Sequence, residues 1–208
     1  MNTNIAEEYK NKFVNENYLH EINGYPERNV EWFKQNILPD CKQYIQDKEL
    51  LLDVGCGFGY FTNLYADYSK KVVGIDFVEK RIEAANKNFK KDNLRFYVGD
   101  LTTLRTDKQF DCIIETAVIQ HIPGNLKLKV FENLYNLSKP GSTFVLYDNC
   151  LDPDKPYTTN DWVDTISPKW ITEALSNIWM VKDFKFHCYD NAGTSNYNAV
   201  YKFLLERR

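Results

Sequence analysis

Three glycines at alternate positions form the part of the chain with the most chemical content. Gly55, Gly57 and Gly59 follow a short apolar run, residues 50–52, and precede a helix-like segment. Glycine has no Cβ, so the backbone can turn sharply there and approach a ligand closely. At a strand-to-helix junction, such a turn directs free amide N–H groups toward a bound molecule. We therefore predict a site for a nucleotide-like small molecule.

The acidic residue Asp53, directly before this turn, narrows the choice of ligand. A dinucleotide site requires Gly-x-Gly-x-x-Gly spacing and places a pyrophosphate beside the start of the helix. Here the spacing is different, and a carboxylate would repel a pyrophosphate but attract a cationic ammonium group. Asp53 therefore favours a ligand that has no phosphate and carries a positive amino-acid end.

Two further acids follow later strand-like runs. Asp76 lies 17 residues after Gly59, where an acidic side chain can accept hydrogen bonds from both hydroxyls of a ribose. Asp100 follows the third strand-like run and can accept a hydrogen bond from an adenine amino group, while Leu101 packs against the edge of the ring. Together these residues describe an adenosine with a cationic amino-acid tail.

The elements that must position these residues alternate between strands and helices. The expected strands are residues 50–54, 71–76, 94–98, 110–115 and 142–148, and the expected helices between them are residues 60–68, 79–91 and 126–137. This alternation predicts a parallel sheet covered by helices, with ligands at the carboxyl ends of the strands. A single acid after a strand is usually a turn or cap residue. Here acidic residues recur at the same edge of the sheet, Glu115 and Asp148 included, and this recurrence favours a binding site.

The pattern changes after residue 148. Residues 149–164 are polar and predict a long loop, and loops of this length are often functional. Ser167-Pro168 predicts the start of a helix, and residues 181–189 and 197–205 predict an antiparallel C-terminal hairpin. We predict a single domain over residues 1–208, with an N-terminal helical cap or lid over 1–45 and a substrate-side loop and helix over 149–180.

Composition restricts the class of partner. The formal net charge of -3 over 208 residues gives no support for a positive electrostatic field that would attract nucleic acid. The five cysteines stand far apart, which favours reduced thiols over disulfides or zinc. No apolar run approaches the ~20 residues of a membrane span, and the first residues lack signal-peptide features. We expect a cytoplasmic protein with no nucleic-acid or membrane partner and no metal; the sequence does not indicate the oligomeric state.

Taken in order, five segments resemble the successive motifs of class I S-adenosylmethionine-dependent methyltransferases: residues 51–62, 73–76, 98–101, 110–123 and 137–148. The resemblance implies a Rossmann-like αβα sandwich whose seven-stranded, mostly parallel sheet has the order 3-2-1-4-5-7-6 with strand 7 antiparallel. It also implies S-adenosylmethionine as the cofactor. The cofactor contacts it implies, with their chain neighbours, are Asp53, Gly55, Cys56, Gly57, Asp76, Phe77, Asp100, Leu101, Glu115 and Thr116.

His121 is the candidate catalytic residue. Methyl transfer from a sulfonium is an in-line displacement, and a base is needed only where the acceptor must lose a proton. His121 follows the fourth strand, where members of the family place substrate-facing residues, and Gln120 beside it is expected to contact the substrate. Residues 115–123 are similar to the segment that carries a catalytic histidine in phosphoethanolamine methyltransferases. The alternative is that the His-Ile-Pro segment only orders the loop.

Other candidates lie in segments that members of the family fold over the cofactor. We expect Tyr18 and Tyr25 to close the site over the substrate and Arg28 to bind the cofactor carboxylate. Trp162 can stack on a sugar ring or enclose a cation. The alternative for all of them is ordinary packing on the sheet.

The resemblance leads us to expect a small-molecule methyltransferase, foremost one that methylates an oxygen of a carbohydrate or a related metabolite. The alternatives are N-methylation of a small amine and a noncatalytic S-adenosylmethionine-binding protein. Methylation of amines in nucleic acid is disfavoured, because residues 115–118 depart from the Asn/Asp-Pro-Pro-aromatic turn of that class. The sequence does not identify the methyl acceptor.

Overall fold

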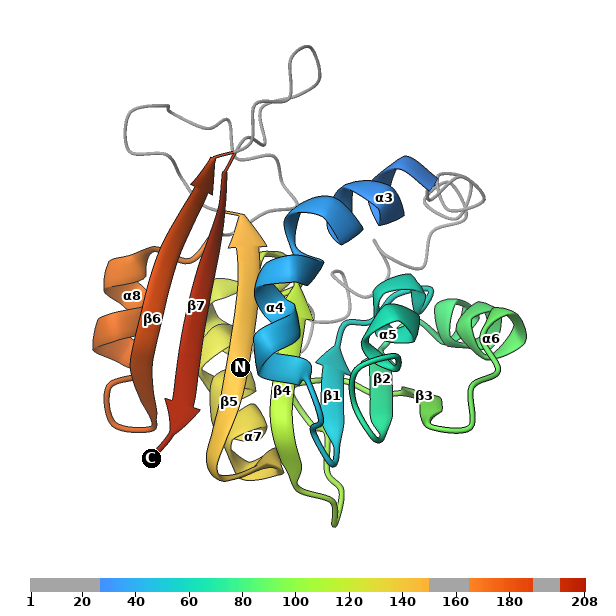
Figure 1. Ribbon diagram of the computed structural model, residues 1–208. Coiled ribbons are helices and arrows are strands. Elements are labelled where there is room, and N and C mark those ends of the chain that lie inside the picture. The colour runs from blue at the N-terminus through green and yellow to red at the C-terminus, as the bar shows by residue number, and fades with distance from the viewer. Residues whose placement is uncertain (1–26, 150–164, 189–198) are drawn as a thin grey trace. The chain divides into compact units, whose positions relative to one another are not determined.

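The computed structural model describes residues 27–149, 165–188 and 199–208 (Figure 1). The strands follow the order β3-β2-β1-β4-β5-β7-β6 in one seven-stranded sheet, and β7 is antiparallel to its neighbours. This order and this antiparallel strand confirm the predicted Rossmann-like α/β fold. The chain groups into two compact units, Met1–Asp100 and Leu101–Arg208, which we describe in turn. The single domain with a lid over residues 1–45 stays a prediction.

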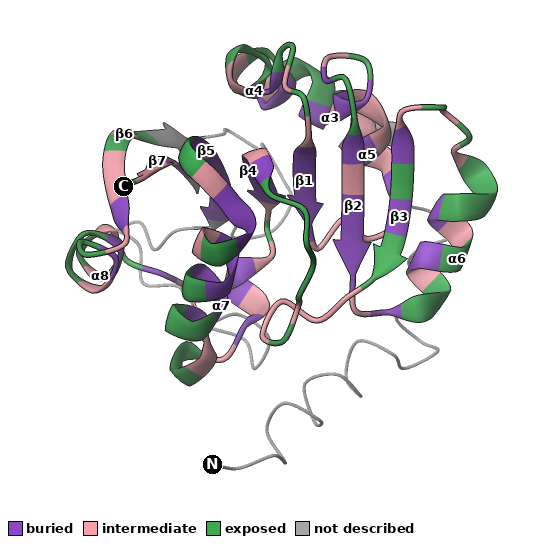
Figure 2. Cartoon of the chain, turned by 90° about the horizontal axis from the view of Figure 1, so that it is seen from below, coloured by how far each residue is buried: buried purple, intermediate pink, exposed green. Residues whose placement is uncertain are grey.

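The strands of the first unit are β1 (Leu51–Val54), β2 (Val72–Asp76) and β3 (Leu94–Val98). They run parallel, so their carboxyl ends share one edge. β1 is buried throughout, whereas β3 alternates between buried and exposed residues, as Figure 2 shows. Burial on both faces explains why β1 has a continuous apolar sequence, which is typical of an inner parallel strand.

The helices of the first unit are α3 (Glu27–Asn36), α4 (Leu38–Ile45), α5 (Tyr60–Tyr65) and α6 (Glu79–Asn88). α5 packs against β2, and α6 packs against β2 and β3. Phe33 of α3 stacks on Phe61 of α5, with ring centroids 3.8 Å apart. α5 and α6 end earlier than the predicted residues 68 and 91, because the chain turns there toward the next strand.

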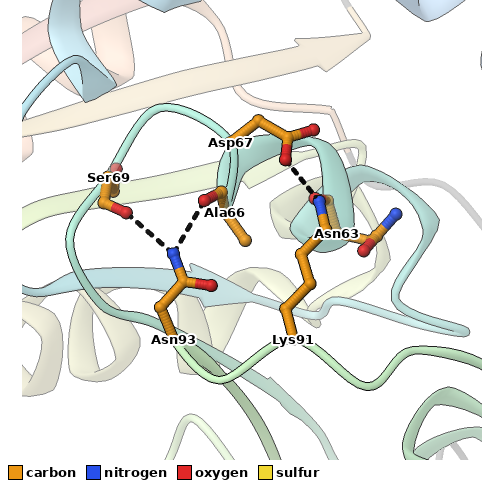
Figure 3. Close-up of polar contacts among 6 residues, drawn as sticks. All are labelled: Asn63, Ala66, Asp67, Ser69, Lys91 and Asn93. Carbon is orange, nitrogen blue, oxygen red and sulfur yellow. Dashed lines mark hydrogen bonds and ion pairs between the residues drawn. The ribbon is translucent and has the colours of Figure 1, made fainter.

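Side chains from the segment before β3 hold the C-terminal end of α5 (Figure 3). Asn93 Nδ2 donates to the carbonyls of Ala66, at 2.7 Å, and Ser69, at 3.0 Å. Lys91 Nζ donates to the Asn63 carbonyl and pairs with Asp67, both at 2.6 Å. A helix of six residues has little stability of its own and leaves its last carbonyls without partners. These contacts therefore fix α5, and with it the glycine turn at its start.

The strands of the second unit are β4 (Phe110–Thr116), β5 (Ser138–Asn149), β6 (Trp179–Cys188) and β7 (Ala199–Arg207). Its helices are the 3-10 helix η1 (Ile119–His121), α7 (Gly124–Leu137) and α8 (Pro168–Ala174). The antiparallel pair of β6 and β7 confirms the predicted C-terminal hairpin. Ser167 caps α8 as predicted, since its side chain accepts the Trp170 N–H at 3.1 Å.

The start of β5 differs from the prediction. The expected helix over residues 126–137 and the expected strand over 142–148 leave a gap that contains Lys139-Pro140-Gly141, but β5 begins at Ser138. Phe110 pairs with Ser138 and Cys112 pairs with Thr143, so the residues between them form an irregular, bulged pairing. The Pro-Gly pair ends α7 without delaying the strand, because the bulge absorbs the extra residues.

Candidate functional site

The glycines of the turn after β1 have different roles in the structure. Gly57 has φ +54°, and a Cβ added there meets no atom of the described residues within 4 Å. Gly59 has φ +78°, and its added Cβ lies 2.5 Å from the Phe96 ring of β3. Both positions favour glycine through their positive φ, but only Gly59 is also required by close packing. The open space over Gly57 is where a ligand can approach the backbone.

Asp76, at the end of β2, braces this turn. Its Oδ2 accepts the Gly57 N–H at 3.0 Å, and its Oδ1 accepts the Val78 N–H at 2.9 Å. Arg81 Nη1 of α6 forms an ion pair with it at 3.7 Å. A carboxylate has about four lone-pair sites, so Asp76 keeps the capacity to accept hydrogen bonds from ribose hydroxyls. The predicted ligand residue is therefore also a structural link between β2 and the turn after β1.

Asp53, at the carboxyl end of β1, is buried together with a hydroxyl partner. Thr62 Oγ1 of α5 donates to Asp53 Oδ2 at 2.6 Å. Burial raises the pKa of Asp53 from 3.8 to about 7; the Thr62 hydrogen bond lowers this pKa, and the charge of Asp76 raises it. Asp53 therefore titrates near neutral pH, where a cationic ligand would favour its charged form. Sequence reasoning missed Thr62, because a threonine within a helix does not by itself indicate a buried partner.

The two predicted adenine-contacting residues are neighbours in the sequence on either side of the boundary between the two units, and each is described within its own unit. In the first unit, Asp100 is half-buried after β3, and the Gly99 N–H donates to the Asp76 carbonyl at 2.9 Å. In the second unit, the Leu101 carbonyl accepts a hydrogen bond from Asn133 Nδ2 of α7 at 2.9 Å. Asn133 is buried and also accepts from Arg105 at 3.0 Å. α7 thus fixes the backbone at Leu101.

The turn after β4, residues 115–118, is held from two sides. Glu115 is fully buried, and its Oε2 accepts the Val118 N–H at 2.9 Å. The Ala117 N–H donates to the Tyr147 carbonyl of β5 at 2.7 Å. Ala117 has φ +58°, which is uncommon for a residue with a Cβ and stores backbone strain. Thr116, beside it, is half-buried.

His121 and Gln120 lie together in η1, directly after this turn. Gln120 is buried, His121 is half-exposed, and Gln120 Nε2 lies 3.1 Å from His121 Nε2. An amide nitrogen only donates, so His121 Nε2 accepts in this arrangement and the ring proton is assigned to Nδ1. A neutral ring with an accepting Nε2 is the form that a general base requires.

Lys127 of α7 is a residue of this region that sequence reasoning missed. It is buried, and its Nζ donates to the carbonyls of Ile119 and Ile122, each at 2.6 Å. The local sequence Lys-Leu-Lys resembles a solvated helix face, and nothing in its pattern distinguishes the buried lysine from its neighbour Lys129.

Several predicted residues lie where the structure says little. Tyr18, Tyr25 and Trp162 are outside the described residues, and Arg28 lies in α3, but its side chain is not among those described. Of the neighbours of the turns, Gly55, Cys56 and Phe77 are half-buried. Within residues 27–149, 165–188 and 199–208, no cluster of three His, Cys, Asp or Glu side chains is placed to hold a metal. None of the helices in these ranges is long and apolar enough to cross a membrane.

Comparison with known proteins identifies the family. A family model described as a methyltransferase domain matches residues 45–189. The chain belongs to this methyltransferase family. It is a class I S-adenosylmethionine-dependent methyltransferase domain, as the order of the motifs predicted, and S-adenosylmethionine is its cofactor. The glycine turn fits this cofactor through the open space over Gly57, the buried acid Asp53 and the remaining acceptor capacity of Asp76.

The methyltransferase is similar to two curated bacterial proteins, each named ubiquinone biosynthesis O-methyltransferase. That of Pelagibacter ubique is 33% identical over 147 residues, which are 68% of this chain and 60% of that protein. That of Rickettsia akari is 26% identical over 208 residues, which are 90% of this chain and 80% of that protein. The chain thus spans less than two thirds of the Pelagibacter relative.

Among solved structures, the methyltransferase is similar to the N-methyltransferase NodS of Bradyrhizobium japonicum in complex with S-adenosyl-L-homocysteine. The two share 17% identity with a TM-score of 0.73, and the likeness covers 97% of both chains. A likeness at this identity shows the fold.

Proposed function

We propose that this methyltransferase transfers a methyl group to a hydroxyl oxygen of a small molecule. The observation that carries the proposal is His121, which is half-exposed after β4 and has its Nε2 3.1 Å from the Gln120 amide nitrogen, a pair that we assign with Nε2 as the acceptor. A hydroxyl oxygen is a poor nucleophile until its proton is removed, and a neutral imidazole is suited to remove it. The Pelagibacter and Rickettsia relatives, both named O-methyltransferases, also favour oxygen as the acceptor atom.

The chain's own residues have distinct roles in this proposal. When bound, S-adenosylmethionine supplies an electrophilic methyl group on a sulfonium. Ionised Asp53 attracts the cationic amino-acid end, and Asp76 accepts hydrogen bonds from the ribose while it holds the Gly57 N–H. Asp100 and Leu101 contact the adenine.

His121 Nε2 takes the proton of the acceptor hydroxyl, and the ring becomes an imidazolium. For this step the amide of Gln120 must give way, because it occupies Nε2 in the structure. The Gln120 amide is then free to contact the acceptor, as the sequence predicted. The acceptor class we propose is a carbohydrate or a related hydroxylated metabolite, with Trp162 stacked on its ring.

A screen of small acceptors with radiolabelled S-adenosylmethionine tests the proposal, with His121→Ala compared against the wild type. We expect methylation of one or more hydroxylated compounds and a loss of turnover of about 10²- to 10⁴-fold in the variant. The affinity for S-adenosylhomocysteine, measured by calorimetry, should stay within about threefold, because His121 has no role in binding the cofactor. Unchanged turnover would show that His121 is not the base.

N-methylation of a small amine is the second candidate. The phosphoethanolamine N-methyltransferase of Triticum aestivum supports it, at 34% identity over 110 residues, which are 51% of this chain and 21% of that protein. Methylation of amines but of no hydroxyl compound in the same screen would favour this candidate. Binding of S-adenosylhomocysteine with no turnover on any acceptor would favour a noncatalytic binding protein.

A further inference from the structure

One ammonium group of α7 holds both ends of the segment that carries Gln120 and His121. Lys127 Nζ donates to the Ile119 carbonyl and to the Ile122 carbonyl, each at 2.6 Å. These carbonyls belong to the residues on either side of Gln120 and His121 in the sequence. One side chain therefore connects both ends of the four-residue segment to the same point on a helix.

The burial of Lys127 carries an energetic cost that an exposed lysine would not have. The side chain is 3% exposed, and placing an ammonium group in the interior is unfavourable unless hydrogen bonds compensate for its lost hydration. An apolar residue of the same length would fill the volume without that penalty. A buried charge is weak evidence for stability, and its best-supported use is to specify one conformation among several.

The η1 segment needs such a constraint. It is a three-residue 3-10 helix, too short to hold itself, and it follows a turn that contains the strained residue Ala117. The backbone bonds within it run from His121 N–H to the Val118 carbonyl, at 2.9 Å, and from Ile122 N–H to the Ile119 carbonyl, at 3.0 Å. Lys127 adds two side-chain hydrogen bonds from α7 to this segment.

We propose that Lys127 is a positioning residue for His121: its buried ammonium group fixes the Ile119–Ile122 segment so that the Gln120 amide meets His121 Nε2. The ring is then held as the tautomer with its proton on Nδ1, so that Nε2 can receive a proton once the Gln120 amide gives way. The importance of this position for turnover rests on the proposed role of His121 as a base. The positioning of the ring does not depend on that role, and it can be measured without a methyl acceptor.

Asn133 provides a matched control on the same helix. It is buried, like Lys127, and its side-chain nitrogen also donates to a carbonyl, that of Leu101, at 2.9 Å. It therefore holds a different loop, the one that we expect to contact the adenine. Removal of either polar head leaves a buried carbonyl without this donor and lowers stability, so stability alone does not separate the two variants.

The test compares Lys127→Met with Asn133→Leu by the ¹⁵N chemical shifts of the histidine rings. The chain has three histidines, so the His121→Ala variant assigns the His121 resonances by their absence. In Lys127→Met, we expect the His121 shifts to move away from the pure Nδ1–H tautomer, while in Asn133→Leu they stay at wild-type values. The affinity for S-adenosylhomocysteine should show the reverse: within about threefold of wild type for Lys127→Met, and about tenfold weaker for Asn133→Leu.

With an acceptor from the screen, Lys127→Met should lower kcat by about 10- to 100-fold with little change in the KM for S-adenosylmethionine, because a displacement of about 1 Å can cost that much. If Lys127→Met does not fold, Lys127→Gln replaces it, since it retains an amide donor that reaches at most one of the two carbonyls.

Wild-type His121 shifts in a folded Lys127 variant would overturn the proposal, whatever happens to turnover. Equal changes in the shifts and in affinity for both helix variants would also overturn it, because they would indicate general loosening of α7. Full turnover in His121→Ala, in contrast, would refute the role of His121 as the base. The positioning of the ring by Lys127 would still be decided by the ¹⁵N chemical shifts.

Discussion

The turn after β1 and the turn after β4 both require backbone with positive φ, but they use different residue types for it. Both follow a buried parallel strand and both contain positive φ angles: at Gly55, Gly57 and Gly59 in the first turn, and at Ala117 in the second. The first turn uses glycine, for which this conformation has no steric penalty, and is braced by Asp76 and by the Cys56 N–H, which donates to the Ile75 carbonyl at 2.9 Å. The second uses alanine and is held by Glu115 and the Tyr147 carbonyl, while Lys127 holds the segment that follows it. In the first turn the residue type removes the steric cost of the conformation, whereas in the second the surrounding contacts must offset that cost.

The largest effect should come from Gly59→Ala. The new Cβ would lie 2.5 Å from the Phe96 ring, at a φ of +78°, so we expect a loss of about 3 kcal/mol or more in the free energy of unfolding. Gly57→Ala should lose only about 1 kcal/mol, because none of the described residues has an atom within 4 Å of the added Cβ, but should weaken S-adenosylhomocysteine binding more than tenfold. Urea unfolding measures the free energy of unfolding of both variants, and calorimetry measures their affinity for S-adenosylhomocysteine. Equal stability losses in the two variants would contradict the division of roles within the turn.

The next effect concerns the charge of Asp53. Its folded pKa, raised from 3.8 to about 7, means that the folded protein binds the proton more tightly than the unfolded chain. Stability should therefore fall as pH rises from about 4 to 7 and level off above, by at most about 4 kcal/mol from this group. Asp53→Asn should remove this dependence, make the unliganded protein relatively more stable at pH 8, and weaken S-adenosylhomocysteine binding there.

Urea unfolding at pH 5 and pH 8 checks this prediction, with Asp107→Asn as the control. Asp107 has a side chain that is 85% exposed, so its replacement should leave the pH dependence unchanged. Ligand binding should also release a proton below about pH 7, which calorimetry in buffers of different ionisation enthalpy detects. The same pH dependence in Asp53→Asn and wild type would mean that this carboxyl does not titrate near neutral pH.

A smaller effect is expected from Thr62, which links α5 to Asp53. Thr62→Val removes the 2.6 Å hydrogen bond that favours the ionised carboxylate, so the pKa of Asp53 should rise further. The pH midpoint for S-adenosylhomocysteine binding should move upward by about half a unit to one unit, and affinity at pH 7 should fall about three- to tenfold. Thr62→Ser keeps the hydroxyl and should keep the wild-type midpoint. A midpoint that moves in neither variant would remove Thr62 from the binding site.

The smallest effect should come from Ala117→Gly in the turn after β4. Glycine relieves the strain of φ +58° but adds conformational entropy to the unfolded chain, so the free energy of unfolding should change by less than about 1 kcal/mol. The contacts of Glu115 and Tyr147 remain, and the His121 ring shifts should stay at wild-type values. Denaturant unfolding and NMR measure the two quantities. A changed His121 tautomer would show that the alanine itself, rather than its partners, sets the turn.

Much of the fold could be predicted from local patterns and from the family resemblance. Alternating strands and helices predicted a parallel sheet covered by helices, the resemblance implied the strand order, and the Ser167-Pro168 pair predicted the start of α8. The Pro-Gly pair after α7 misplaced the start of β5, because a bulge depends on the partner strand and not on the residues that bulge. The predicted roles of the site residues, His121 included, stay predictions that the variants above test.

The sequence by itself located the turn after β1, because glycine spacing and an adjacent acid are local properties that can be recognised without the rest of the chain. The tertiary structure supplied the partners of this turn, Asp76 and the Phe96 ring. The tertiary structure decided which polar side chains are buried and what they hold. Thr62, Lys127 and Asn133 have ordinary helical surroundings in the sequence. Each becomes a constraint on the site only because folding removes it from water and leaves a carboxylate or a carbonyl as its partner.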